Sequence, residues 1–243
     1  MKIFSLAVFV VVLASTIYGV RFFLLLQKSK ALVARATPFE KMGDMSAPPF
    51  LFVGDSTAVG VGSMRAEDTY AGYFGRDYPN RTIQNLSQSG RKTGEILPIL
   101  RAREDASADW VFLQTGGNDI LYFTQNDVVA REIDDALSEA KRIGRHTVLL
   151  TSGNVGLAPF FPRWMGGIWS RKTQQVRKIF QQAAQKHGAL YIDLYRERED
   201  DLFLTDIPRF YGSDLLHPSG DGYKHWYDET RKAINAEGLE GEL

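Results

Sequence analysis

The chain has 243 residues, of which 44% are hydrophobic and 24% charged, a composition that suits one globular domain with an appendage. Its 29 basic and 29 acidic residues balance, and no Lys/Arg block stands out after the N-terminal segment, so nothing indicates a nucleic-acid partner. There is no cysteine, which excludes disulfides, thiolate metal sites and a cysteine nucleophile.

The first 26 residues are apolar, unlike the rest of the chain. Ile3–Val20 carries no charge, Arg21 interrupts, and Phe22–Leu26 continues the run. A helix over Ile3–Leu26 would be about 36 Å long, enough to span a hydrocarbon core of ~30 Å. A cleaved signal peptide is the alternative, but its apolar region usually has only about 7–15 residues. We therefore expect a single-pass anchor in the plasma (inner) membrane, contacting the bilayer through residues 3–26.

The charges around this segment differ little between its two sides. Lys2 flanks one side, and the other carries Arg21, Lys28, Lys30 and Arg35. The positive-inside rule then favours a cytoplasmic C-terminal domain, but the small difference leaves an outward-facing domain open. Gln27–Ala47 is polar and contains Pro and Gly, so the predicted organisation is an anchor over 1–27, a linker over 28–48 and a globular domain over 49–243.

From Pro49 onward, strand-like and helix-like segments alternate. The strand candidates are Phe50–Val53, Thr82–Leu86, Trp110–Thr115, Thr147–Thr151 and Leu190–Leu194. The helix candidates are Thr69–Asp77, Thr93–Glu104, Asn126–Ile143, Arg171–His187 and Gly220–Ala236. Short apolar strands between amphipathic helices predict an α/β fold, in which a parallel sheet is covered by helices on both faces.

Gly54-Asp55-Ser56 directly follows the first predicted strand. In a parallel sheet, ligands gather beyond the carboxyl ends of the strands, so the Ser56 hydroxyl is placed to meet a substrate. A serine hydroxyl becomes a useful nucleophile when an adjacent imidazole takes its proton. The alternative is a plain turn with a capping serine.

Two further blocks follow predicted strands. Gly90 comes after Thr82–Leu86, and a glycine there lets a backbone N–H approach a ligand closely. Asn118, in Gly116-Gly117-Asn118-Asp119, can donate its side-chain amide to a developing oxyanion. Taken singly, each is better explained as a turn.

The base that Ser56 needs is offered by Asp214-Leu215-Leu216-His217-Pro218. The three-residue spacing allows the Asp214 carboxylate to hold one imidazole nitrogen of His217 while the other faces Ser56. The alternative is a surface pair near a helix start. His146, His187 and His225 are expected to be structural.

Together the four blocks resemble the SGNH/GDSL hydrolase superfamily, in which each block is named for one residue: Ser, Gly, Asn or His. Ser56, Gly90, Asn118 and His217 occur in that order within residues 50–218. The resemblance implies a flavodoxin-like three-layer α/β/α fold with a five-stranded parallel sheet.

The same resemblance implies the roles of the residues. Ser56 would be the nucleophile, His217 the general base and acid, and Asp214 its orienter. The oxyanion hole would consist of the Ser56 N–H, the Gly90 N–H and the Asn118 amide, and no metal or cofactor is implied. Thr57 departs from the Leu of the family name, and Ala58 departs from the Gly-x-Ser-x-Gly elbow of the commoner α/β-hydrolases.

The expected function is hydrolysis of a small-molecule or glycan ester through an acyl-Ser56 intermediate. Short-chain esters, O-acetylated sugars and lysophospholipids all stay open as substrates. The alternatives are acyl or acetyl transfer to an envelope glycan and a non-catalytic envelope binding protein. The long aromatic segment Gly153–Trp169 is interpreted as a pocket wall, as core packing or as a bilayer contact.

Overall fold

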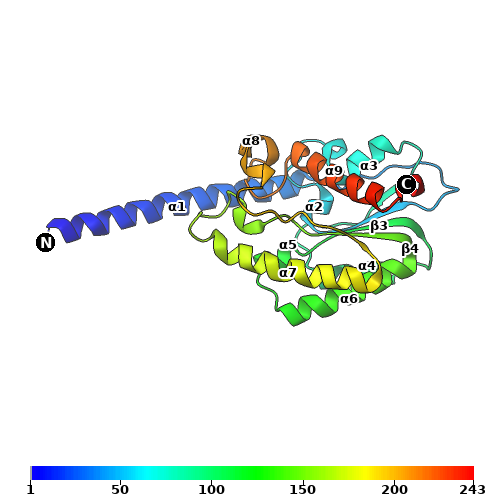
Figure 1. Cartoon of the computed structure of the whole chain (residues 1–243). Helices are drawn as coiled ribbons and strands as arrows, with labels where there is room; N and C mark the ends of the chain where they lie inside the picture. Colours follow the sequence, from blue (N-terminus) through cyan, green and yellow to red (C-terminus); the bar gives the residue numbers. More distant parts are fainter. Residues whose placement is uncertain (1) are drawn as a thin grey trace.

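The computed structural model describes the backbone of residues 2–243 and the side chains of residues 9, 12, 13 and 15–243. Five parallel strands form one sheet in the order β2-β1-β3-β4-β5. They are β1 (Phe50–Gly54), β2 (Ile83–Asn85), β3 (Ala108–Gln114), β4 (Gly144–Leu150) and β5 (Leu190–Ile192). This is the flavodoxin-like order, so the predicted sheet is confirmed (Figure 1).

The two central strands are buried along their whole lengths. Every residue of β1 and β3 is buried, which is why both read as nearly continuous apolar runs. Their register pairs Phe52 with Phe112, and these rings stack at 4.6 Å between centroids. The stacked rings thus pack β1 against β3 in the core, and Asp55-Ser56 follows directly after β1.

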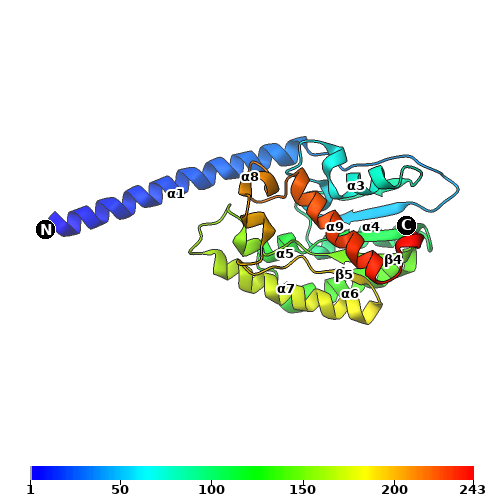
Figure 2. The ribbon, with the colours of Figure 1, turned by 45° about the horizontal axis from the view of Figure 1, so that its top comes forward.

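Helices cover both faces of the sheet, as predicted for three layers. α6 (Asn126–Ile143) and α7 (Gly166–His187) lie on one face, and α3 (Tyr70–Asp77) and α9 (Gly220–Ala236) lie on the other (Figures 1 and 2). The apolar stripe of α6 is buried at Val129, Ile133, Leu137 and Ala140, because 3.6-residue periodicity turns these side chains to the sheet. The bounds of α6 and α9 match the predicted ones.

Other elements differ from the prediction at their ends. The predicted helix Thr93–Glu104 is a 3-10 turn over Thr93–Ile96 followed by the short α4 (Leu97–Arg101), whose first turn contains Pro98. α7 begins at Gly166, five residues before the predicted start at Arg171. The remaining helices are α2 (Ser56–Val59), α5 (Gly117–Leu121) and α8 (Ile207–Phe210), and 3-10 turns occur at Ala66–Asp68, Val155–Leu157, Leu202–Leu204 and Glu240–Glu242.

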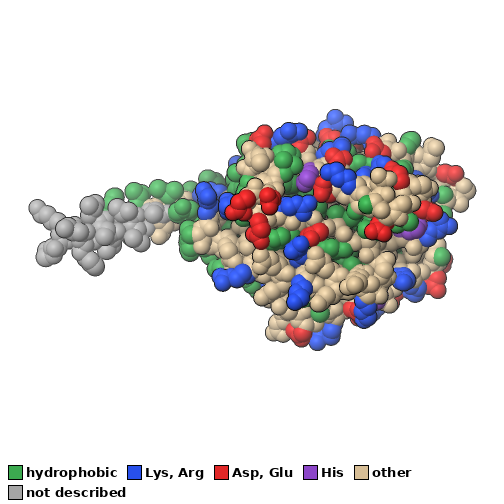
Figure 3. Space-filling view, viewed as in Figure 1, with side chains coloured by type: hydrophobic (Ala, Val, Ile, Leu, Met, Phe, Trp, Pro, Cys, Tyr) green, Lys and Arg blue, Asp and Glu red, His purple; other side chains and the backbone are tan. Residues whose placement is uncertain are grey.

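The N-terminal segment forms one helix, α1 (Lys2–Arg35), which projects from the end of the body at the carboxyl ends of the strands (Figures 1 and 2). Apolar side chains cover its described part near the body (Figure 3). Part of the predicted span 3–26 lies outside the described side chains. Within the described part of the chain, no helix combines the length and apolar character needed to cross a membrane, so the predicted span is not confirmed.

The segment after α1 packs against the edge of the sheet. Lys41 forms an antiparallel bridge with Ile83 of β2. The Gly43 N–H donates to Thr82 Oγ1 at 3.0 Å, and the Asp44 N–H donates to Asn80 O at 2.7 Å. The second half of the predicted linker is therefore hydrogen-bonded to the body.

Candidate active site

Ser56, His217 and Asp214 form a continuous hydrogen-bonded chain. Ser56 Oγ lies 2.9 Å from His217 Nε2, and His217 Nδ1 lies 2.6 Å from Asp214 Oδ2. Asp214 is fully buried and His217 is 8% exposed, so one end of the chain is shielded from water while Ser56 lines a pocket. The structure thus brings together two blocks that lie 161 residues apart in the sequence.

The nucleophile turn depends on a close approach between β1 and β3. A Cβ added to Gly54 would lie 1.9 Å from Gln114 O, so no side chain fits at this position. Asp55 is the N-cap of α2 and accepts from the Thr57 N–H at 2.9 Å and from Thr57 Oγ1 at 2.8 Å. The Thr that replaces the family's Leu is therefore part of the cap. Burial raises the pKa of Asp55, and the two bonds from Thr57 oppose that rise.

The loop that carries His217 is held by backbone contacts. Asp214 Oδ1 accepts from the N–H groups of Leu216 and His217, both at 3.1 Å. Leu215, the residue after Asp214, has φ +61°, a left-handed backbone conformation that is uncommon for a residue with so large a side chain. Burial alone would raise the pKa of Asp214, but its contacts with His217 and the two N–H groups outweigh burial and lower it.

Asn118 lines the same pocket from the first turn of α5. Its Nδ2 donates one hydrogen to Arg91 O at 2.9 Å, and the second amide hydrogen is available for another acceptor. Next to it, the fully buried Asp119 accepts from the Thr93 N–H at 2.9 Å and from Thr93 Oγ1 at 2.8 Å. Asp119 therefore ties the Asn118 turn to the segment that follows β2.

Gly90 lies in an exposed turn and is absent from the pocket lining. The Arg91 N–H donates to Gln88 O, and Gly90 has φ +89°, the position of a type II turn that favours glycine. The Gln88 N–H donates to Gly54 O at 3.1 Å, which places this turn beside the nucleophile turn. The structure thus brings Gly90 near the site but not into the pocket lining.

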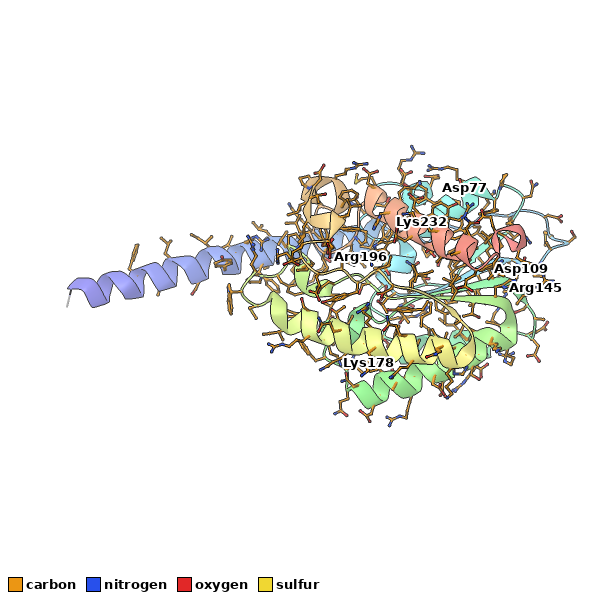
Figure 4. All side chains as sticks on the ribbon, in the orientation of Figure 1. Asp77, Asp109, Arg145, Lys178, Arg196 and Lys232 are labelled. Carbon is orange, nitrogen blue, oxygen red and sulfur yellow. The ribbon has the colours of Figure 1, made fainter. Side chains whose placement is uncertain are left out.

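The pocket at Ser56 has about 950 Å³ of space, counted out to its open mouth. Beyond Ser56, Asn118 and His217, its wall is mainly apolar and aromatic: Leu121, Val155, Ala158, Leu194, Leu202, Phe203, Tyr211, Leu216, Pro218 and Trp226. Polar groups also reach it, among them Arg196, Asp201 and His225. Arg196 is labelled in Figure 4, at the opposite end of the sheet from Asp109 and Arg145, which mark where β3 and β4 begin.

Several of these residues were not predicted from the sequence. Phe203, Tyr211 and Trp226 form an aromatic wall, and their clustering around the Asp214–His217 block was the available signal. His225, expected to be structural, also lines the pocket. No sequence signal points to Arg91, because it contributes only a backbone carbonyl. Among the described residues, no group of three His, Asp or Glu side chains is placed to hold a metal ion.

The segment Gly153–Trp169 divides between two of its predicted roles. Gly153, Asn154, Val155 and Ala158 line the pocket. Phe160 and Phe161 are buried in the core, and Trp169 stacks on Phe161 at 4.1 Å between centroids. Trp164 is 77% exposed. The segment is a pocket wall at its start and core packing further along.

Comparison with known proteins agrees with this geometry. The family model described as "GDSL-like Lipase/Acylhydrolase family" matches residues 52–225. Among solved structures, a lipolytic G-D-S-L protein from Veillonella parvula is 17% identical with a TM-score of 0.62, and the match covers 78% of this chain and 99% of that one.

Two further solved structures have a similar fold. TesA is 17% identical with a TM-score of 0.60, covering 77% of this chain and 98% of that one. The acetylxylan esterase Axe2 from Geobacillus stearothermophilus is 19% identical with a TM-score of 0.57, covering 80% and 96%. No curated protein matches the chain significantly. The family model covers most of the chain and includes every block from Ser56 to His217, and the chain is therefore a hydrolase of the GDSL-like lipase/acylhydrolase family.

Proposed function

We propose that the protein hydrolyses carboxylic esters through an acyl intermediate on Ser56. The observation that carries this proposal is the chain from Ser56 Oγ through His217 to Asp214, with distances of 2.9 and 2.6 Å. Ser56 also follows the buried strand β1 and lines the pocket that would receive the substrate.

In the acylation step, Ser56 Oγ attacks the ester carbonyl carbon while its proton passes to His217 Nε2. The tetrahedral intermediate then expels the alcohol oxygen, which takes the proton from His217. Asp214 accepts from Nδ1–H throughout, so it holds the tautomer whose Nε2 is free to act as a base. Deacylation repeats the sequence with water as nucleophile and releases the acid.

Three groups are proposed to stabilise the oxyanion. The N–H groups of Ser56 and Gly90 have no hydrogen-bond acceptor among the described residues, and Asn118 Nδ2 has one hydrogen beyond its bond to Arg91 O. Removing one such donor costs about 2.7–4 kcal/mol of transition-state stabilisation in a comparable site. Asn118→Ala should therefore lower kcat by about 10²–10³-fold.

The substrate that the pocket favours is an ester with an apolar acyl group. Phe203, Tyr211 and Trp226 line the same pocket as Ser56, and burial of alkyl or aromatic carbon against such side chains is favourable by about 25 cal/mol per Å². An acetylxylan esterase is among the similar structures, so O-acetylated sugars belong in the same test. A series of esters with lengthening acyl chains should show kcat/KM rising with length, and a preference for acetyl esters would overturn this substrate class.

A covalent probe tests the nucleophile. A fluorophosphonate should label the wild-type chain and fail to label Ser56→Ala, because the probe bonds to an activated serine oxygen. Equal labelling of the two proteins would contradict the assignment.

If added sugar acceptors turned the product from free acid into a new ester, acyl transfer would replace hydrolysis as the function.

We also propose that the predicted span 3–26 anchors the protein in the plasma (inner) membrane through the part before Arg21, because Arg21 and Leu25 contact the body of the enzyme. Support comes from the uncharged run Ile3–Val20 and from the exposed apolar side chains of the described part of α1. The full chain should sediment with membranes and resist extraction by alkaline carbonate. Recovery of the full chain in the extract would contradict the anchor.

A further inference from the structure

The last apolar turns of α1 are docked on the body of the enzyme. Arg21 is the single charged residue within 3–26, and its guanidinium donates to Pro159 O at 2.5 Å and to Phe160 O at 3.4 Å. The ring of Phe22 meets the ring of Phe160 edge-on at 5.3 Å between centroids. Leu25, one turn further, is 6% exposed and joins the hydrophobic core.

The carbonyls that Arg21 contacts belong to a segment with two links to the active site. The first is the pocket wall, because Val155 and Ala158 of the same segment line the pocket. The second is a hydrogen bond from the Phe160 N–H to Leu215 O at 2.9 Å. Leu215 directly follows Asp214 and precedes Leu216 and His217, whose N–H groups donate to Asp214 Oδ1.

Leu215 needs such support from its surroundings. Its φ of +61° is unfavourable for a leucine, and a residue holds this conformation only where neighbouring contacts impose it. In this structure the Leu215 N–H donates to Gly212 O, and Leu215 O accepts from the Phe160 N–H, both at 2.9 Å. Releasing the second bond would free the peptide that sets the direction of the Asp214–His217 pair.

We propose that Arg21 and Phe22 of α1 are positioning residues for catalysis. They hold Pro159 and Phe160, and Phe160 in turn holds Leu215 and the imidazole of His217. The inference rests on the proposed role of His217 as base for Ser56, and it assigns α1 a part in turnover that is separate from any role as an anchor. A displacement of about 1 Å between base and nucleophile is enough to slow a reaction by the order of 10²-fold.

The test compares matched pairs of variants in the full chain. Arg21→Ala removes the two donations, and its control is Lys28→Ala, which changes an exposed cation on the same helix. Phe22→Ala removes the contact with Phe160, and its control is Phe23→Ala. Both side chains are exposed, at 45% and 57%, but only the Phe22 ring meets an aromatic partner among the described residues. Each protein is assayed for kcat, KM and the rate of fluorophosphonate labelling, all per folded molecule as measured by circular dichroism.

Arg21→Ala and Phe22→Ala should lower kcat and the labelling rate by roughly tenfold to a hundredfold, and the two controls should match the wild type. Arg21→Lys should restore part of the loss, because an ammonium can donate to one of the two carbonyls. Wild-type kcat and labelling in both variants would overturn the inference while leaving the proposed function intact. A loss that disappears when rates are expressed per folded molecule would overturn it as well. Failure of the wild type itself to be labelled would overturn both this inference and the proposed function.

Discussion

At the scale of single residues, Gly62 shows how closely the backbone packs against the loop that carries His217. Gly62 has φ +102°, and a Cβ added there would lie 2.2 Å from Pro218 O and 2.9 Å from His217 Cβ. The backbone of the nucleophile segment therefore packs directly against the residue that carries the base. Any side chain at this position must push the His217 loop away from Ser56.

Gly62→Ala should lower both stability and turnover. The left-handed conformation costs a residue with a Cβ of order 1–3 kcal/mol, and the clash displaces His217. Thermal unfolding and kcat of the variant give the two effects. Gly238→Ala is the matched control, since Gly238 also has positive φ but nothing lies within 4 Å of its added Cβ. This control should lose stability alone, and a Gly62→Ala enzyme with unchanged kcat would contradict the argument.

At the scale of elements, the site is assembled by short turns at the carboxyl ends of β1, β2 and β3. The Asn118 turn is held to the segment after β2 through Asp119 and Thr93. Asp119 Oδ1 has no hydrogen-bond partner among the described residues, so Oδ2 alone joins Asp119 to Thr93. A buried carboxylate with so few donors depends strongly on each one.

Thr93→Val should destabilise the protein by about 1–3 kcal/mol, because it removes the hydroxyl donor and keeps the shape of the side chain. It should also lower kcat, since the Asn118 turn loses one of its two ties to Thr93. Chemical denaturation and steady-state kinetics measure both changes. Thr93→Ser retains the hydroxyl and should resemble the wild type, and a Val variant as stable as the Ser variant would refute the role of this bond.

At the scale of the whole molecule, Asp214 links pH to the hydrogen bonds that join it through His217 to Ser56. The pKa of Asp214 is lowered below its ordinary value of 3.8 by its contacts with His217 and the backbone, which outweigh burial. Its carboxylate is therefore charged throughout the range where an imidazole titrates. A charged Asp214 accepts from His217 Nδ1–H throughout this range, which keeps Nε2 directed at Ser56.

The contacts of Asp214 with His217 and the backbone should accordingly persist from pH 4 to 8. The stability that Asp214 contributes is present above pH 3.8 and is lost only as the pH falls through its lowered pKa. Circular dichroism at pH 5 should thus show a folded chain, because the Asp214 contacts are still present there.

The fold and the active-site blocks were largely predictable because their signals are local. Asn126–Ile143 was predicted at its observed bounds, since its apolar residues recur every three or four positions. The split of Thr93–Glu104 was missed although Pro98 marks it, and the early start of α7 was missed because Gly166 and Gly167 favour no helix. The aromatic pocket wall was missed although its members lie near the Asp214–His217 block in the sequence, since they come from separate loops and helices.

The sequence by itself determined which residues could do the chemistry: Ser56 after a buried strand, Asn118 after another, and Asp214 with His217 at a spacing that joins them. The tertiary structure alone decided that His217 Nε2 lies 2.9 Å from Ser56 Oγ, that Leu215 adopts φ +61°, and that Arg21 meets Pro159 and Phe160. The physical reason is the separation along the chain between the residues that interact. Burial periodicity, caps and glycine turns depend on neighbours along the chain, whereas these contacts depend on how sheet, loops and α1 pack together.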